Sequence, residues 1–309
     1  MAPSATTSPA QANSVHKSSN GNPPQEEETP LQAICHGPIK LPGIPTFPTF
    51  ASHRHWALNH MTAAFRHWAR SGYVEGMSGH ISLRDPEYPH AFWTNPLAVH
   101  FGLLKASDMI LLSDSPNDGG IVLAGNRSRP ANAAGWLIHA AIHRKRRDVN
   151  AACHAHTRYG KAWSAFGRRL EMINQDVCNF YGDAQAVYEQ YGGVVLGEAA
   201  LEGERIAEAL GPRGKGILLS NHGLLTVGGT VDEAAFMFTS MEIACGVQLE
   251  VEKAGLERKF IGDEEAEFNF RMASQPDTLY WEFQAYYDYE KAMSDNFEDL
   301  RVEDVYIHV

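Results

Sequence analysis

The stretch Cys153-His154-Ala155-His156-Thr157-Arg158-Tyr159-Gly160 carries two histidines that are separated by one residue. Residues 149–153, which lead into it, are mostly small or apolar and are typical of a buried strand. Because side chains alternate along a strand, His154 and His156 are expected to point to the same side. Both imidazoles can then reach one point at the end of the strand, where open metal sites are commonly built.

A third histidine stands in Ser220-Asn221-His222-Gly223-Leu224-Leu225. The apolar run 216–220 predicts another buried strand, and Gly223 permits a sharp turn directly after it. We therefore predict that His154, His156 and His222 bind one divalent metal ion. Since the chain has 15 histidines, the alternative that the pair consists of ordinary core or surface residues stays open.

Three histidine ligands favour a catalytic site over a structural one. Neutral imidazoles leave the double charge of the ion uncompensated and at least one coordination position open, whereas structural zinc sites fill all four. Such a site suits Lewis acid chemistry on a carbonyl compound, in which an enolate is stabilised. Zinc is the expected metal, with Fe(II), Mn and Co as alternatives, and ferrous iron would also leave positions for dioxygen.

Further segments occur in an order that resembles the class II aldolase/adducin family, and they cover most of the chain after about residue 50. They are Ser78-Gly79-His80-Ile81-Ser82, Trp136-Leu137-Ile138-His139, Arg147-Asp148-Val149-Asn150 and Asn221-His222-Gly223-Leu224. The resemblance implies a three-layer α/β/α sandwich, with a divalent metal on the residues that match His154, His156 and His222. It also implies a small-molecule substrate and a homotetramer with active sites between subunits.

Two positions depart from the sugar-phosphate aldolases of that family. Their acid/base glutamate lies nineteen residues before the first metal histidine, and here that position is Gly135, which cannot carry a proton. His80 replaces an asparagine that helps those enzymes to hold phosphate. Phosphorylated sugars therefore become less secure substrates, and the small residues 132–135 suggest room for a bulkier keto acid.

Either another group must then move protons or the reaction must be different, and His80, Asp176 and Tyr181 are our predicted catalytic residues. Asp176 and Tyr181 belong to residues 175–181, which resemble a segment of oxidative decarboxylases that use non-haem iron. We expect a strand there. The alternative to a catalytic role is that this strand belongs to the core and that Asp176 pairs with an arginine. Ser78, Gly79, His100 and Asn132 are predicted to bind substrate. His80 and His100 are also compatible with ordinary hydrogen-bonded loop histidines.

Composition narrows the class of protein. The net charge of −11 disfavours nucleic acid as a partner, and the short basic run 144–147 is explained by a helix C-terminus. The four cysteines are widely spaced and read as reduced, packed thiols. A secretory signal and an apolar stretch of about twenty residues are both missing, so no membrane association is expected and a cytoplasmic location is the default.

The chain divides into a leader, residues 1–50, and a domain, residues 51–309, that includes a C-terminal extension. The first 30 or so residues are rich in Ser, Thr, Ala, Pro, Asn and Gln and are predicted to be disordered, and an extended lead-in follows. Periodicity and capping signals predict helices over 53–71, 132–143, 160–166, 201–210 and 231–254, and strands over 80–83, 91–94 and 194–197. This alternation indicates an α/β domain.

Three functions compete. The first is a metal-dependent lyase that acts on a hydroxy-carbonyl or keto-acid substrate by aldol cleavage or decarboxylation. The second is a non-haem iron oxygenase or oxidative decarboxylase on the same three histidines. The third is an adducin-like assembly protein without chemistry, which the retained histidine triad disfavours.

Overall fold

A computed structural model describes residues 28–114, 120–190, 199–294 and 296–307. They contain one sheet of eight strands in the order β4-β3-β2-β1-β5-β8-β7-β6. Only β6 and β7 pair in parallel, and the other neighbours are antiparallel. The strands are β1 His80–Arg84, β2 Ala91–Thr94, β3 Ile110–Ser113, β4 Val122–Gly125, β5 Ala151–Ala155, β6 Gln185–Tyr188, β7 Gly216–Leu219 and β8 Gly223–Gly228.

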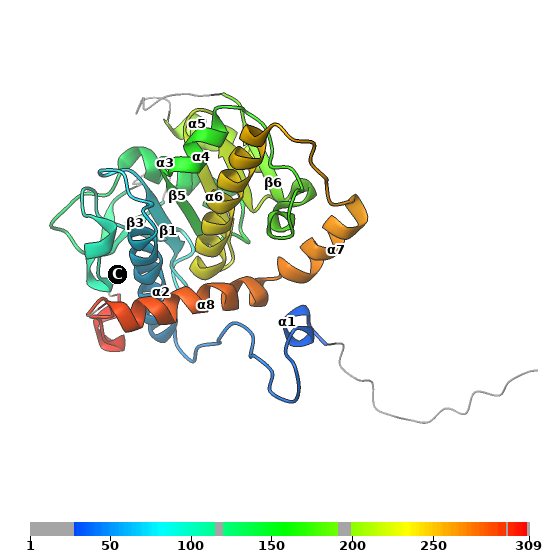
Figure 1. The fold of residues 1–309 in the computed structure, drawn as a ribbon. Helices are drawn as coiled ribbons and strands as arrows, with labels where there is room; N and C mark the ends of the chain where they lie inside the picture. The colour runs from blue at the N-terminus through cyan, green and yellow to red at the C-terminus, as the bar shows by residue number, and fades with distance from the viewer. Residues whose placement is uncertain (1–27, 115–119, 191–198, 295, 308–309) are drawn as a thin grey trace, which may run out of the picture.

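Helices cover both faces of this sheet, which confirms the three-layer α/β/α architecture. The helices are α1 Pro30–Ala33, α2 Phe50–Arg70, α3 Ala133–Lys145, α4 Arg158–Ser164, α5 Ala199–Leu210, α6 Val231–Ala254, α7 Asp263–Ala273 and α8 Pro276–Met293. Cys153 of β5 packs with α2, α6 and α8 on one face, whereas its neighbour Ala152 packs with α3 and α5 on the other. In Figure 1, α2 (blue) and α6 (yellow) stand against the sheet, and α8 (orange) crosses their lower ends.

Helix α6 has the bounds that the sequence predicts. Its N-cap Thr230 accepts a hydrogen bond from the backbone N–H of Glu233, and Gly255 ends it with a left-handed φ of +62°. By length and apolar composition α6 is also long enough to cross a membrane, but 67% of its most apolar window is buried within the domain. Its contacts with β5, β8, α2 and α8 identify it as a core helix.

Several expectations about local structure need correction. Residues 175–181 are not a strand: Asp176–Phe180 form a 3₁₀ helix, because Cys178 and Tyr181 donate backbone hydrogen bonds to carbonyls three residues earlier. The strands β3, β4, β6 and β8 and the helices α1, α7 and α8 were not predicted. The disorder expected for the start of the chain falls mostly on residues 1–27, and the strand expected at 194–197 falls on 191–198, so both lie outside the described residues.

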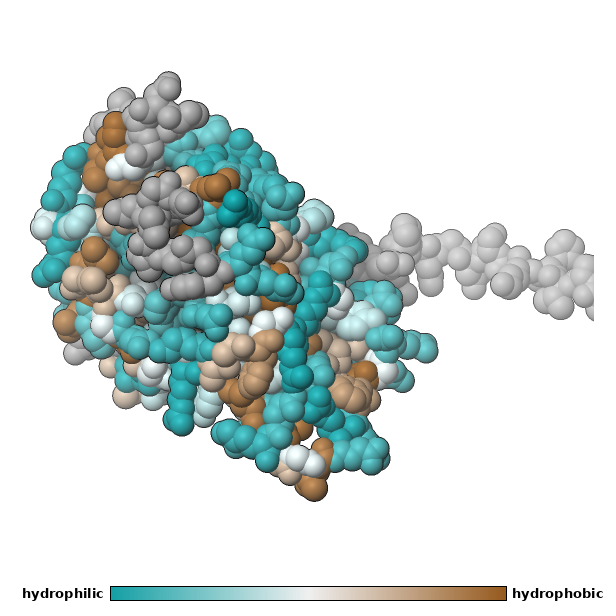
Figure 2. Space-filling view, turned by 90° about the horizontal axis from the view of Figure 1, so that it is seen from above, coloured by the Kyte–Doolittle hydropathy of each residue, from teal (hydrophilic) through white to brown (hydrophobic). Residues whose placement is uncertain are grey.

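The lead-in from residue 28 to residue 49 lies against α8. The carboxylate of Asp277 accepts a hydrogen bond from the backbone N–H of Ile44 at 2.9 Å, and the indole N–H of Trp281 donates to the carbonyl of Pro42 at 2.5 Å. In the view of Figure 2, hydrophilic residues dominate the surface and hydrophobic ones form small separate patches. The division of the chain at residue 50 remains a prediction.

Candidate metal centre

His154 and His156 leave the end of β5 on the same side, as the alternation of side chains requires. His154 is the penultimate residue of β5 and pairs with Leu225 of β8, and His156 follows the last residue of the strand. Gly79 precedes β1, which is the other neighbour of β5. Its φ is +99°, and a Cβ atom there would come within 3.0 Å of the carbonyl oxygen of His154. Gly79 therefore allows the loop before β1 to approach the histidine pair.

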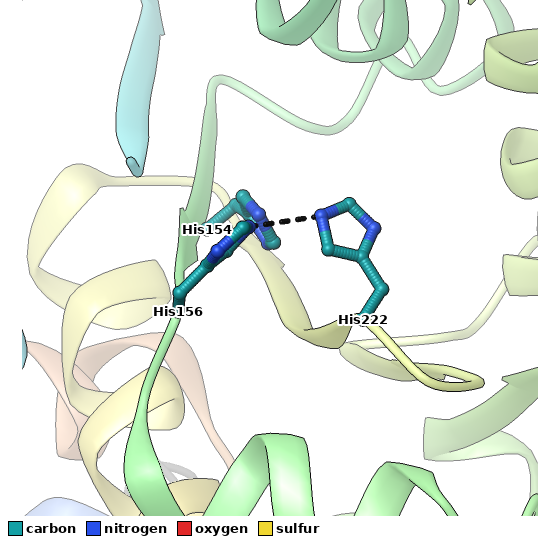
Figure 3. Close-up of side chains that lie close together, drawn as sticks. All are labelled: His154, His156 and His222. Atoms are coloured by element: carbon teal, nitrogen blue, oxygen red, sulfur yellow. Dashed lines mark hydrogen bonds between the residues drawn. The ribbon is translucent and has the colours of Figure 1, made fainter. Parts of the chain in front are cut away.

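His222 comes from the turn between β7 and β8. Asn221, immediately before it, has a φ of +58°, a left-handed conformation that asparagine tolerates better than most residues. The backbone N–H of His222 donates to the carbonyl of Leu219, which closes the turn. As Figure 3 shows, the ring of His222 faces the rings of His154 and His156 from across the site.

The donor atoms of these three histidines fit one divalent ion. One nitrogen of each ring lies within 4.8 Å of the others, and the Nε2 atoms of His156 and His222 are 3.0 Å apart. Nδ1 of His154 donates to the carbonyl of Leu224 at 2.7 Å, which leaves Nε2 with a free lone pair. This is the tautomer that a metal ligand needs.

Burial favours the neutral, metal-binding form of all three rings. Desolvation lowers the pKa of His154 well below its ordinary value, and the neighbouring imidazoles lower it further. Burial, assisted by His156, lowers the pKa of His222 to about 4. The pKa of His156 is lowered by burial as well, although Glu75 opposes the shift. Near neutral pH the ligands therefore need not release protons before they bind a metal.

A cavity of about 480 Å³ opens beside the three histidines. This volume is typical of a site for a small organic molecule. Apolar and small side chains dominate its wall, which includes Met77, Leu97, Ala133, Ala134, Ile138, Leu219 and Leu225. Among the described lining residues there is no lysine or arginine, and Glu202 of α5 is the single carboxylate. The described lining therefore places a mainly apolar wall beside the three histidines.

His80 and Gly135 meet at the back of this cavity. A Cβ atom at position 135 would lie 2.1 Å from Nε2 of His80 and 2.3 Å from its Cδ2. Gly135 belongs to the first turn of α3, whose N-cap Asn132 accepts a hydrogen bond from the Gly135 N–H at 3.0 Å. The imidazole of His80 therefore occupies the space that any side chain at position 135 would enter.

The structure gathers some of the predicted site residues and separates others. Ser78, Gly79, His80 and Asn132 line the cavity together with the three histidines. His100 does not: it is exposed, and its Nδ1 accepts a hydrogen bond from the N–H of Gly102 at the start of a 3₁₀ turn. From its loop it is Leu97 that reaches the cavity.

Asp176 and Tyr181, predicted to be catalytic, lie away from the cavity of their own chain. Asp176 lies near Glu282 of α8, whose pKa is raised by burial and then by the charge of Asp176. Tyr181 lies near α7, where partial desolvation and the carboxylate of Asp263 raise its pKa. Because the segment coils into a 3₁₀ helix, these side chains do not extend toward the histidines as those of a strand would.

Sequence reasoning missed Glu202 as a cavity residue. It sits in an ordinary helical stretch, and no motif marks it. A signal was present beside it: Gly203 is a glycine inside a helix, which often indicates close packing. A Cβ atom there would lie 2.9 Å from the carbonyl of Leu137, so Gly203 lets α5 approach α3 and brings Glu202 to the cavity.

Comparison with known proteins agrees with this geometry. Residues 59–249 match the family model described as Class II Aldolase and Adducin N-terminal domain. The solved structure of an L-fuculose 1-phosphate aldolase from Glaciozyma antarctica PI12 superimposes with a TM-score of 0.74 at 36% identity, covering 82% of this chain and 96% of that one.

Two curated relatives are similar in sequence over much of their length. The Meiotically up-regulated gene 14 protein of Schizosaccharomyces pombe is 39% identical over 257 residues, which are 82% of this chain and 96% of the relative. A Streptomyces roseochromogenus protein named 4-hydroxy-3-prenylphenylpyruvate oxygenase/4-hydroxy-3-prenylbenzoate synthase is 44% identical over 213 residues, 68% of this chain and 73% of the relative.

Proposed function

Since the chain belongs to the class II aldolase and adducin family, we propose that it is a divalent-metal-dependent carbon–carbon lyase of the decarboxylase or retro-aldol type. Its proposed substrate is a 2-oxo acid or hydroxy-carbonyl compound with a bulky apolar group. The observation that carries this proposal is the apolar cavity beside the three histidines, in which the wall lacks a cation among the described residues.

His154, His156 and His222 would hold the ion, and zinc is the proposed metal. When bound, a divalent ion acts as a Lewis acid that polarises a carbonyl and stabilises negative charge on its oxygen. The 2-oxo acid or hydroxy-carbonyl end of the substrate belongs at this positively charged end of the cavity. Its apolar group would pack against residues such as Ile138 and Leu225.

Two polar groups of the cavity would orient the substrate. His80 lies at the back wall, where burial and the neighbouring His139 keep its pKa well below the ordinary value, so its neutral ring can donate one hydrogen bond and accept another. Glu202 would repel a phosphate and accept a hydrogen bond from a substrate hydroxyl. We propose these roles for His80 and Glu202 because Gly135 cannot supply an acid/base group.

An oxygen-dependent reaction is the second candidate. The Streptomyces relative is named as an oxygenase of a prenylated aryl pyruvate, and at 44% identity it favours an aromatic 2-oxo acid as substrate. Histidine ligands also suit ferrous iron. An adducin-like role in assembly is the third candidate, and the complete histidine triad disfavours it. A homotetramer is proposed in each case.

The test is turnover of bulky hydroxy-keto acids and of aryl pyruvates by protein loaded separately with zinc and with ferrous iron. Cleavage of the hydroxy-keto acid without oxygen uptake would support the lyase, because the electron pair of the broken carbon–carbon bond passes into an enolate. Consumption of oxygen with an aryl pyruvate by the iron-loaded protein would favour the oxygenase instead. L-Fuculose 1-phosphate serves as the comparison substrate. Turnover of the sugar phosphate in preference to the aryl pyruvates would contradict the proposed substrate class.

A further inference from the structure

A chain of buried histidines runs behind His80, away from the metal centre. Ser82 lies two residues after His80 on β1 and so faces the same side of the sheet. Its hydroxyl lies 2.8 Å from Nδ1 of His139 and 2.7 Å from Nε2 of His143, both on α3. All three residues are at most 1% exposed.

The hydrogen bonds of this chain can run in only one direction. Nδ1 of His143 lies 3.2 Å from the carbonyl oxygen of Val149, which can only accept, so Nδ1 carries the proton. Burial lowers the pKa of His143 to about 3, so the ring is neutral and its Nε2 is an acceptor. The Ser82 hydroxyl therefore donates to His143, and its oxygen accepts the Nδ1–H of His139.

The remaining nitrogen of His139 is left as a buried acceptor. Burial keeps the pKa of His139 well below its ordinary value, so a proton on Nδ1 means that Nε2 carries a lone pair. Within the described part of the chain, Nε2 of His139 has no hydrogen-bond partner. A buried acceptor without a partner costs about 1–3 kcal/mol, so its retention calls for an explanation.

The ring of His80 packs against the ring of His139, with centroids 4.2 Å apart and planes at 72°. His80 in turn lies 5.2 Å from His154, measured between ring centroids. We propose that Ser82, His139 and His143 form a positioning relay: they fix the His139 ring as the Nδ1–H tautomer, and the packing of this ring against His80 orients the His80 ring over Gly135 beside the metal centre. Only the expected change in kcat rests on the proposed function, whereas the orientation of the His80 ring does not depend on it.

Removing the Ser82 hydroxyl tests the relay with little change in volume. In Ser82→Ala the His80 ring should turn away from Gly135 or adopt several orientations, which a crystal structure would reveal. With the aryl pyruvate substrate, kcat should fall about 10- to 100-fold while KM changes less than about twofold. Metal content should stay that of the wild type, because His154, His156 and His222 are untouched.

Two further variants separate positioning from folding. Ser82→Thr keeps the hydroxyl and should restore the His80 orientation and most of kcat, whereas Ser240→Ala removes a buried hydroxyl of α6 outside the relay and should leave both unchanged. An unmoved His80 ring in Ser82→Ala would overturn the relay, as would full activity of that variant. If no aryl pyruvate is turned over by the wild type, the crystal structures still decide, so failure of the proposed function is recognised separately.

Discussion

His80 occupies the space above Gly135 so closely that a Cβ atom on residue 135 would lie 2.1 Å from its Nε2. Gly135 and His80, the two departures from the sugar-phosphate aldolase pattern, therefore depend on each other for packing. An imidazole fits at the back of the cavity only because position 135 has no side chain, and a side chain at 135 requires a different residue, or a different rotamer, at position 80.

The first prediction is that Gly135→Ala displaces His80. Inside a helix this substitution usually stabilises by up to about 1 kcal/mol, but here the added methyl group overlaps the imidazole ring. We expect kcat with the preferred substrate to fall at least about tenfold, with metal content unchanged. Steady-state kinetics and elemental analysis measure the two quantities.

Combining the change with His80→Asn gives the matched control. Asparagine removes the ring that clashes, so in the His80→Asn background the Gly135→Ala change should add little further loss of activity. Losses that multiply in the double variant would show that the two residues act independently, contrary to the packing seen here.

The sequence predicted the parts of this site that local patterns encode. His154 and His156 follow from strand alternation, and the position of His222 follows from a strand that ends at a turn. The family resemblance then identified Gly135 as the vacated position. What the sequence could not provide was the distance between His80 and Gly135, because this distance depends on how α3 packs against β1.

The differences between the sequence predictions and the structure have a similar origin. Asp176 was assigned to the site because residues 175–181 resemble a decarboxylase segment; this segment forms a 3₁₀ helix instead of the expected strand, and Asp176 does not line the cavity of its own chain. Glu202 reaches the cavity only through the close approach of α5 to α3. Strands such as β3, Ile110–Ser113, are short apolar runs, which periodicity alone does not distinguish from buried helix segments.

The second prediction concerns Glu242, a buried carboxylate of α6 that fixes the start of α4 next to His156. It accepts hydrogen bonds from the Thr157 hydroxyl at 2.5 Å and from the backbone N–H groups of Tyr159 and Gly160 at 2.8 and 2.6 Å. Glu242→Gln should lower the free energy of unfolding by about 2–3 kcal/mol, because charge-assisted hydrogen bonds are lost and an amide group faces N–H donors.

Chemical denaturation measures this loss, and Glu250→Gln on an exposed position of the same helix is its control. The control should change the free energy of unfolding by less than about 0.5 kcal/mol. Equal stability of the two variants would argue against a structural role for Glu242 at the start of α4.

The third prediction is a pH dependence that comes from His67. Its ring is 7% exposed and stacks on Tyr286 at 4.0 Å, and burial lowers its pKa to about 4. Between pH 6.5 and about 4 the unfolded chain binds a proton at this residue that the folded chain does not. The free energy of unfolding therefore decreases as the pH falls through this window, by about 1.4 kcal/mol per pH unit for this group.

His67→Gln should remove this contribution of about one proton, so the free energy of unfolding should depend less steeply on pH, by about 1.4 kcal/mol per pH unit. This holds whatever the substitution does to the absolute stability. The measurement is a series of denaturation curves between pH 7 and pH 5, with His36→Gln on an exposed residue as the control. An unchanged slope in His67→Gln would contradict the assignment of a neutral, buried imidazole to this position.

The fourth prediction concerns the charge of the cavity wall. Glu202→Gln keeps the size of the side chain and removes its negative charge, so an anionic group at that end of the cavity is repelled less. We expect the KM for substrates with a phosphorylated tail to fall about three- to tenfold, while uncharged apolar tails change little. A KM that falls no more for phosphorylated tails than for uncharged ones would show that the charge of Glu202 does not exclude phosphate.

The most direct test of the account is the metal content of the purified protein, measured by elemental analysis beside His154→Ala and His222→Ala. His36→Ala, which changes an exposed histidine far along the sequence from the triad, controls for nonspecific binding. We expect about one divalent ion per chain in the wild type and in the control, and its loss in both triad variants. A wild-type protein that takes up no divalent metal, or triad variants that keep it, would contradict the metal centre.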